Sequence, residues 1–375
     1  MRVYLDNAAT TAIDGEVLDA MTNAMRECYG NPSSTHYLGR KSKSHIERAR
    51  KNIAKHLNCK PGEVFFTSGG TEADNMAIRC AVNDYGIKHI ITTTIEHHAV
   101  GHTAEDLRKS GAASVSYVNL DEKGHVDLDH LEELLKNNSQ SLVSLMYANN
   151  EIANILPCKK VSALCRKYDA LFHTDTVQSL GHYPYDLSAL DVDFITCAAH
   201  KFHGPKGVGF LYVNDKISIR PFIFGGSQER NMRGGTENLH GIVGLSVAMD
   251  VAHREMEAHK NHIKALKAHM IQRLENEISG VQFNGDSANV DGSLYTVLSV
   301  SLPPSPIGAM LLFNLDIMGI CCSGGSACSS GSNVGSHVLS GIGADPTRPA
   351  VRFSFSKYNT MEEVNYAIDK LVELY

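Results

Sequence analysis

The chain has 375 residues, of which 43% are hydrophobic and 20% charged, and its formal net charge is -6. This is the composition of a globular protein, and the acidic balance argues against a nucleic-acid-binding face, which needs clustered Lys and Arg. The length exceeds what one hydrophobic core usually serves, so we expect one large domain and a smaller one.

Signals for export, membrane insertion and metal binding are not found in the sequence. The opening residues MRVYLDNAATT lack the basic-then-apolar order of a signal peptide, and no apolar run reaches the roughly 18 residues that span a bilayer. We therefore expect a cytoplasmic protein without membrane contact. The nine cysteines form no CxxC pair, which argues against a disulfide framework and a structural metal site.

Short segments rich in β-branched and aromatic residues alternate with helical patterns in the first part of the chain. These predicted strands are 62–68, 88–94, 113–120, 141–148, 169–175, 191–198 and 207–213. The alternation predicts an α/β fold with a mostly parallel seven-stranded sheet and helices on both faces. Ligands of such sheets bind beyond the carboxyl ends of the strands.

The remaining segments predict the smaller domain, with an α+β fold. A long helical pattern at 237–278 leads away from the sheet, and strand or helix patterns follow at 295–302, 307–318, 351–356 and 360–375. We expect a large domain of residues 14–255 and a small domain made of 1–13 and 256–375. The Gly- and Ser-rich stretch 321–336 predicts a mobile loop.

Two predicted strands end in residues suited to a phosphate and a planar ring. Gly70 and Thr71 begin a helix whose free N–H groups could hold a phosphate, although a glycine turn with a threonine cap is also a common structural feature. His97 follows the next strand, where its imidazole could stack on a flat ligand and move protons.

Two further strands end in a carboxylate and an amine. Asp175 lies in an apolar setting with Gln178 three residues later, so it either caps the next helix or is a buried carboxylate that needs partners. Lys201 is either a surface lysine at a loop tip or a partly desolvated, nucleophilic amine. A phosphate cradle, a stacking imidazole, a buried carboxylate and a lysine together meet the needs of pyridoxal 5′-phosphate (PLP).

Motifs spread in order over the whole chain resemble those of cysteine desulfurases of the NifS/IscS type, in the class V aminotransferase superfamily. They are YLDNAATT, GNPSSTHYLG, FFTSGGTEADN, TIEHHAV, NNEI, HTDTVQS, HKFHGPKGVGFLYV, GGSQERNMRGGTEN and GSACSSG. The resemblance implies the PLP-dependent transferase fold type I, a homodimer and conversion of L-cysteine to L-alanine with a persulfide left on the enzyme. The sulfur would then pass to an iron–sulfur scaffold or another acceptor, such as a tRNA-thiolation protein.

The resemblance also implies roles for the cofactor-binding residues. Lys201 would hold the cofactor as a Schiff base, His97 would stack on its ring and act as acid or base, and Asp175 would meet the pyridine nitrogen. Gln178 and Asn150 would contact the ring hydroxyl and the substrate region.

The resemblance further implies which residues bind the phosphate and the substrate, and which residue accepts the sulfur. The phosphate would be held by Gly70, Thr71 and His200 of one chain and by Thr236 of the partner subunit. The substrate carboxylate would bind Asn31 and Arg352. The sulfur acceptor would be Cys328 in GSACSSG, ahead of Cys321 and Cys322, whose apolar lead-in suggests burial at a strand end.

Two departures from the family pattern and three rival functions stay open. The Cys321-Cys322 doublet is one departure, and it could relay sulfur or form an inhibitory disulfide with Cys328. Ala198-Ala199 stands where many relatives carry a Ser-Gly or Ser-Ser pair, so one hydroxyl donor to the phosphate is missing. The rival enzymes are a selenocysteine lyase or an aminotransferase, although an aminotransferase has no use for a cysteine on a mobile loop. A rival of another class is an inactive, PLP-binding scaffold in a sulfur-transfer complex.

Overall fold

The structure is a computed structural model that describes residues 1–324 and 335–375. Its largest sheet has the seven predicted strands, in the order β2-β8-β7-β6-β5-β3-β4. The strands β4, β3, β5, β6 and β7 run parallel, and β8 is antiparallel to both of its neighbours. The bounds are β2 Val64–Thr67, β3 His89–Thr92, β4 Ser114–Tyr117, β5 Ser141–Ser144, β6 Leu171–Asp175, β7 Phe194–Ala198 and β8 Gly209–Val213.

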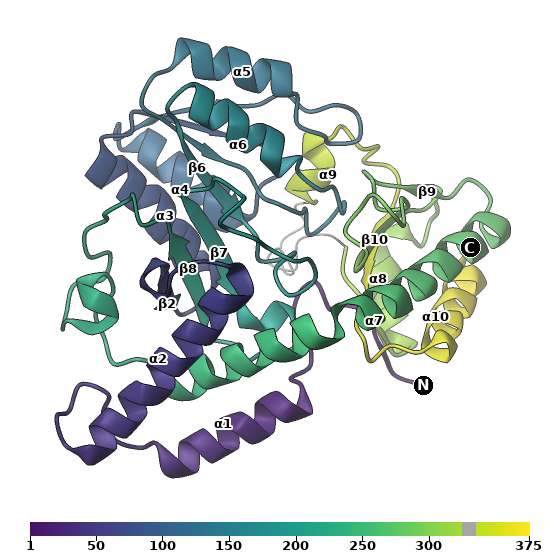
Figure 1. Cartoon of the computed structure of the whole chain (residues 1–375). Helices are drawn as coiled ribbons and strands as arrows, with labels where there is room; N and C mark the ends of the chain where they lie inside the picture. Colours follow the sequence, from purple (N-terminus) through teal and green to yellow (C-terminus); the bar gives the residue numbers. More distant parts are fainter. Residues whose placement is uncertain (325–334) are drawn as a thin grey trace.

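Helices cover both faces of this sheet (Figure 1). Successive residues of a strand point to opposite faces, so Ile90 packs with α3 and α4 while Ile91 packs in the core on the other side. Burial on both faces explains the continuous apolar runs of these strands. The bounds are α1 Gly15–Glu27, α2 Tyr37–Leu57, α3 Gly70–Tyr85, α4 His98–Lys109, α5 Leu128–Asn137 and α6 Cys158–Lys167.

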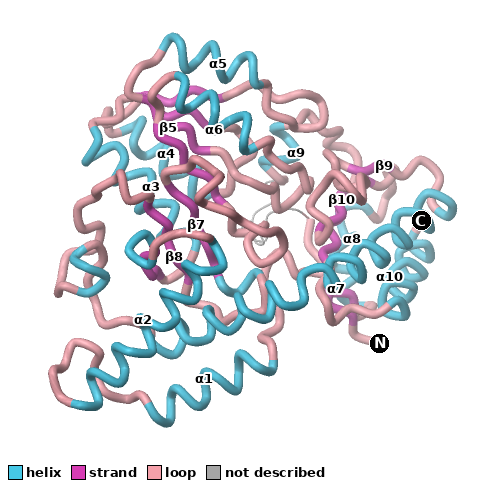
Figure 2. Tube along the Cα trace, in the orientation of Figure 1, coloured by secondary structure: helices cyan, strands magenta, loops and turns pink. Residues whose placement is uncertain are grey.

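A smaller group of strands and helices lies at one end of the molecule, beside the large sheet (Figures 1 and 2). An antiparallel sheet has the order β12-β10-β9, and β1 from the N-terminus pairs in parallel with β11. The bounds are β1 Val3–Tyr4, β9 Gln282–Phe283, β10 Val297–Ser301, β11 Ile320–Cys321, β12 Ala350–Ser354, α8 Leu311–Ile317 and α10 Met361–Leu374. The short helix α9 (His337–Gly341) instead packs against Ile95 and Ile152, in loops that follow strands of the large sheet.

One long helix, α7 (Leu239–Glu277), connects the two groups. Its first half contributes Leu245 and Met249 to a core of the large sheet, and its second half contributes Leu266 and Met270 to the core of the small sheet. Since α7 continues without a break through Glu255, the expected domain boundary at this residue stays a prediction.

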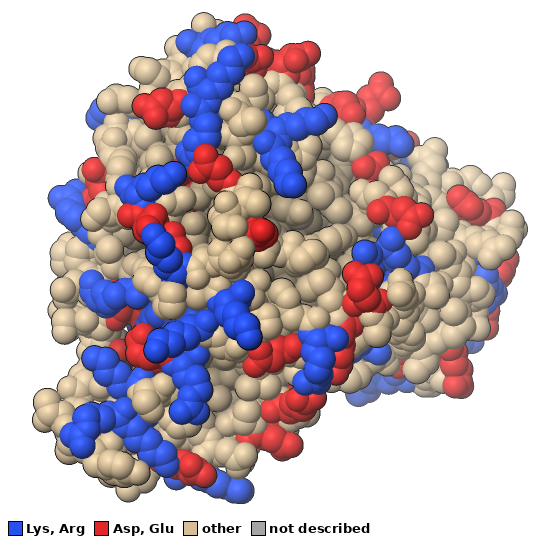
Figure 3. All heavy atoms as spheres, viewed as in Figure 1, with Lys and Arg blue, Asp and Glu red and all other residues tan. Residues whose placement is uncertain are grey.

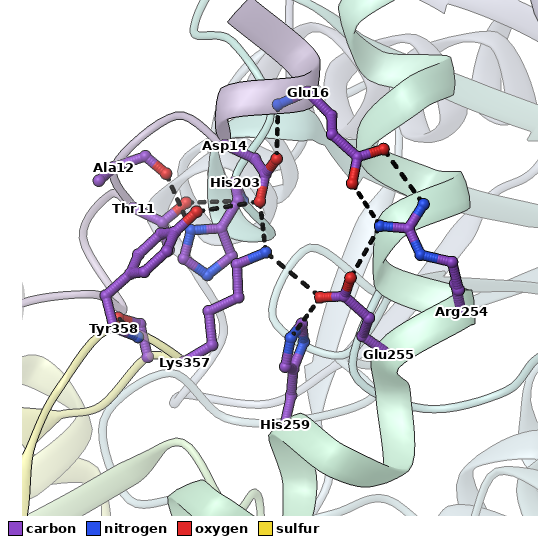
Figure 4. Close-up of polar contacts among 11 residues, drawn as sticks. Thr11, Ala12, Asp14, Glu16, His203, Arg254, Glu255, His259, Lys357 and Tyr358 are labelled. Carbon is purple, nitrogen blue, oxygen red and sulfur yellow. Dashed lines mark hydrogen bonds and ion pairs between the residues drawn. The ribbon is translucent and has the colours of Figure 1, made fainter.

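A network of charged side chains ties the start of α1 to α7 and to the segment before α10 (Figure 4). Asp14 accepts a hydrogen bond from Tyr358 Oη at 2.9 Å and forms an ion pair with Lys357. Glu255 on α7 lies 3.8 Å from Lys357 Nζ and 2.8 Å from His259 Nε2. The network thus ties the segment before α10 to α7 and to the start of α1.

The surface is mixed in charge. Figure 3 shows basic and acidic side chains interspersed, with a denser basic group in the region where α2 lies in Figure 1. Among the described residues, no helix combines the length and the apolar character that crossing a membrane requires.

Candidate active site

A cavity of about 270 Å³ lies at the carboxyl ends of β6 and β7 and faces the N-terminus of α3. Such an edge of a parallel sheet is where ligands bind in α/β proteins. The structure brings most of the predicted site residues to this one cavity. Those that line it are Gly70, Thr71, His97, Asn150, Asp175, Gln178, His200, Lys201 and Arg352.

The other predicted residues do not line the cavity in this single chain. Asn31 lies in the turn before α2, where its Oδ1 accepts a hydrogen bond from the Ser33 N–H at 2.9 Å. Thr236 lines a separate cavity together with Arg233. Cys328 lies outside the described residues. The roles of these three residues stay predictions.

Lys201 ends a short 3-10 turn (Ala199–Lys201) that directly follows β7. Its Nζ donates hydrogen bonds to the backbone oxygens of Ala8 at 2.7 Å and Ala9 at 2.9 Å. Lys201 is half-buried in the cavity wall, so it is not a surface lysine at a loop tip. Two carbonyl oxygens of the N-terminal segment thus hold the amine in the cavity wall.

The N-terminus of α3 opens onto the same cavity. Its N-cap is Gly69, with φ 151° and no side-chain capping bond, so the alternative of a threonine cap does not apply here. A Cβ on Gly70 would lie 2.7 Å from Val177 Cγ2, which explains why glycine is required there. The first N–H groups of a helix have no intrahelical partner, so this end is suited to an anion.

The carboxylate of Asp175 is buried at the end of β6. Its Oδ1 accepts a hydrogen bond from the Val177 N–H at 2.8 Å and a long one from Thr196 Oγ1 at 3.4 Å. A turn follows, so Asp175 does not cap a helix. Burial raises the pKa of Asp175 to about 6, and the negative charge of Asp74 adds to this rise.

His97 is the N-cap of α4, and its Nδ1 accepts a hydrogen bond from the Ala99 N–H at 3.1 Å. In the neutral ring this leaves the proton on Nε2. Burial lowers the pKa of His97, so the neutral form is favoured. His97 can therefore offer a flat ring with one N–H donor.

Arg352 on β12 is 2% exposed, and its guanidinium is partly satisfied by the protein. It donates to Asp6 Oδ1 at 3.0 Å and to the backbone oxygen of Asn150 at 2.9 Å. Its Nε makes no hydrogen bond within the described part of the chain. A buried arginine in a cavity wall is suited to a carboxylate ligand.

Sequence reasoning missed two features of this cavity. The backbone oxygens of Ala8 and Ala9 carry no signal in their side chains. Asp74 also lines the cavity and is buried, whereas an acidic residue in the first turn of a helix commonly serves only to stabilise that end of the helix. A signal did exist, because Asp74 is spaced with Gly70, Ala73 and Ala77 on the buried face of α3.

These residues fit PLP. The open end of α3 suits its phosphate, the His97 ring its flat face, the buried Asp175 carboxylate its ring nitrogen and the Lys201 amine its aldehyde. The Arg352 guanidinium also belongs to the cavity wall, and such a group suits an amino-acid carboxylate.

The model of one protein family, "Aminotransferase class-V", matches residues 3–367. The chain belongs to the class V aminotransferase family. Members of this family depend on PLP, in agreement with the cavity.

Individual proteins similar to this chain include one curated relative and two solved structures. The "Cysteine desulfurase IscS" of Dictyoglomus turgidum is 43% identical over 98% of this chain and 93% of that protein. A solved structure described as a NifS-like protein is 40% identical, has a TM-score of 0.91 and is matched over 100% of this chain and 99% of its own. Another, "SspA in complex with cysteine", is 30% identical, with a TM-score of 0.81 over 96% and 100% of the two chains. The predicted class V fold type I is thereby confirmed.

Proposed function

We propose that the protein is a PLP-dependent cysteine desulfurase that converts L-cysteine to L-alanine and carries the sulfur as a persulfide on Cys328. The observation that carries this proposal is the meeting of an amine, a buried carboxylate, an imidazole and an open helix N-terminus in one cavity. Cysteine desulfurases that match almost the full length of the chain add support.

The proposed roles of the cofactor-binding residues follow from their positions. Gly70, Thr71 and His200 would hold the phosphate at the N-terminus of α3, and Asp175 would bind the ring nitrogen. His97 would stack on the ring, while Gln178 and Asn150 would contact the ring hydroxyl and the substrate region. The bound cofactor supplies a ring that takes up the electron pair of a broken Cα–H bond.

Residues of the chain bind the substrate and move its protons. Arg352 holds the carboxylate of L-cysteine with its fixed guanidinium, and Asn31 assists. Lys201 Nζ takes the Cα proton, since it lies in the cavity wall beside the proposed ring position. His97 Nε2 assists the proton transfers to and from the substrate.

Sulfur transfer requires the Cys328 thiolate. Its Sγ attacks the substrate sulfur, so an S–S bond forms and the C–S bond breaks. The electron pair of that bond stays with the carbon fragment, which becomes alanine after protonation. An exposed thiolate is the reactive form in such an exchange.

Two measurements test the proposed function. L-Cysteine should give alanine in the presence of a thiol reductant, and mass spectrometry of the protein without reductant should find one extra sulfur on the peptide with Cys328. Borohydride should fix the cofactor to Lys201, and Lys201→Ala should abolish this. Exchange of amino groups with a keto acid, without sulfur release, would instead identify an aminotransferase.

The proposed function also includes a homodimer and a protein that accepts the sulfur. We propose a homodimer in which Thr236 completes the partner subunit's phosphate site, because Thr236 lies outside the cavity of its own chain and nearby Phe224 is 84% exposed. The sulfur would pass to an iron–sulfur scaffold or another acceptor protein, in the cytoplasm. Light scattering measures the mass of the assembly and so tests the homodimer. Mixing the inactive variants Lys201→Ala and Thr236→Ala should restore activity only if each site takes Lys201 from one subunit and Thr236 from the other.

A further inference from the structure

A second carboxylate, that of Asp74, lies beside Asp175 and is not used in the proposed reaction. Asp74 is one helical turn after Gly70 on α3 and is 1% exposed. One oxygen each of Asp74 and Asp175 and one nitrogen of His97 all lie within 4.8 Å of one another. Two carboxylates this close in a buried place cannot both be ionised without a large electrostatic cost.

The remaining neighbours of Asp74 do not neutralise it. His173, two residues before Asp175 on β6, points to the same face, and its Nε2 lies 3.4 Å from Asp74 Oδ1. Neither atom makes a hydrogen bond within the described part of the chain. The other ring nitrogen of His173 lies 2.8 Å from Ser144 Oγ, and burial lowers its pKa to about 4, so His173 is neutral at pH 7.

The other groups around this pair come from three further elements. On β7, Thr196 is the register partner of Asp175, and its hydroxyl lies between the two carboxylates. Before α4 lie Glu96, whose buried carboxyl has its pKa raised to about 8, and the neutral His97. Lys201 directs its Nζ to the oxygens of Ala8 and Ala9. The surroundings therefore favour a single negative charge on the pair.

We propose that Asp74 is a positioning residue that keeps a proton while Asp175 stays ionised, so that the pair presents one charge, that of Asp175, to the cofactor ring nitrogen. The part concerning the ring nitrogen rests on the proposed function. Asp175 Oδ1 accepts a hydrogen bond from the Val177 N–H at 2.8 Å, whereas Asp74 Oδ1 accepts none within the described residues, so the negative charge is better held on Asp175 and the proton lies on Asp74. Burial raises the pKa of both carboxyl groups, in agreement with a proton held by the pair. Protonated Asp74 places no second negative charge beside Asp175, so the Asp175 carboxylate can stay ionised in this buried place.

Infrared difference spectra of the full-length protein test the proton directly. At about pH 6, below the pKa of Asp74, Asp74→Asn should lose one carboxylic-acid C=O band relative to wild type. Glu96→Gln is the matched control, because it removes another buried protonated carboxyl and shows the size of such a loss. If only Glu96→Gln loses a band, Asp74 is ionised and the proposal is wrong.

The pH dependence of stability gives a second test that needs no cofactor. A folded pKa raised above the unfolded value of 3.8 means that the folded chain binds an extra proton between about pH 4 and pH 7, so wild type loses stability as pH rises through this window. Asp74→Asn lacks this loss. The melting temperature of the variant minus that of wild type should therefore increase as pH rises and become constant above about pH 7. The opposite trend would mean an ionised Asp74 paired with His173.

The role toward the cofactor is tested by PLP titration of the cofactor-free protein. Asp74→Ala should weaken PLP binding by about tenfold, and Asp74→Asn, which keeps a neutral polar group of the same shape, should recover most of this loss. Equal losses in both variants would show that a charged Asp74 is needed and would overturn the proposal. Failure of all PLP binding in wild type would instead refute the proposed function, while the infrared and stability tests would stand.

Discussion

Lys201 Nζ donates a 2.7 Å hydrogen bond to the backbone oxygen of Ala8, so a residue from the N-terminal segment holds the amine at the end of β7. The same segment supplies Asp6, which pairs with Arg352 at 3.0 Å. The first ten residues thus fix both the proposed cofactor-binding amine and the proposed substrate-binding guanidinium. Their contribution is made by backbone oxygens and one carboxylate at the wall of the cavity.

Ala198→Ser should strengthen PLP binding. Ala198 ends β7 in the wall of the cavity, and its Cβ lies 3.8 Å from the position a Cβ on Gly70 would take. A hydroxyl there adds a donor to a charged phosphate, which should lower the dissociation constant of PLP by about tenfold. Titration of cofactor-free protein, followed by absorbance, measures this change.

Ala199→Ser is the matched control for this prediction. Ala199 is fully buried, and its Cβ lies only 2.7 Å from the position a Cβ on Gly204 would take. A hydroxyl at residue 199 should lower the melting temperature without a gain in PLP affinity. Equal gains in both variants would mean that the added donor does not act at the phosphate.

Arg352→Lys should impair substrate binding while PLP stays bound. Lysine keeps the charge that pairs with Asp6 but loses the planar fork that holds a carboxylate. We expect the KM for L-cysteine to rise by about tenfold or more, with an unchanged cofactor absorbance. Arg348→Lys is the control, because Arg348 bonds Ser301 on the neighbouring strand and does not line the cavity. A KM that stays at the wild-type value would remove Arg352 from the substrate site.

Cys328→Ser should separate cofactor chemistry from sulfur transfer. The variant should keep its cofactor absorbance but lose sulfide release by about a hundredfold or more, since a serine hydroxyl cannot accept sulfur. Cys322→Ser is the control, because Cys322 is half-buried and burial raises its pKa to about 12, which disfavours the reactive thiolate. Sulfide release that fails only in Cys322→Ser would transfer the acceptor role to Cys322.

Lys267→Met should change how stability depends on pH. Lys267 is fully buried on α7, donates to Ser293 Oγ at 2.9 Å, and burial lowers its pKa to about 7. Between about pH 7 and 10.5 the unfolded chain binds a proton that the folded chain lacks, so the free energy of unfolding rises with pH, by at most about 1.4 kcal/mol per unit.

Urea unfolding at about pH 7 and pH 9 measures this slope. Lys267→Met should remove it, whereas Lys264→Met, on the same helix but with a partly exposed amine paired to Asp291, should keep it. A slope that persists in Lys267→Met would show that another group causes the pH dependence.

Much of the site could be predicted because its side chains follow strands in the sequence. Asp175 and Lys201 each come directly after a recognisable apolar run, and parallel strands bring such positions to one edge. Asp74 was missed because acidic residues near the start of a helix commonly stabilise that end from the surface, and only the packing of α3 shows that this one is buried.

Other features depend on contacts that the sequence does not specify. The hydrogen bonds from Lys201 to Ala8 and Ala9 join positions 193 and 192 residues apart and involve backbone oxygens, which every residue type offers. Asn31 and Thr236 fit a family pattern, yet neither residue lines the cavity in one chain. For Thr236, the proposed homodimer would supply the missing connection.

The unbroken course of α7 bears on how the molecule melts. Its 39 residues supply side chains to the interior beside each sheet, and its hydrogen bonds run on from one to the other. Loosening of either interior should fray the helix on which the other depends, because helical structure is cooperative. Calorimetry should therefore find one heat-absorption peak for the full chain, and cutting the chain within α7 should leave neither fragment able to fold alone.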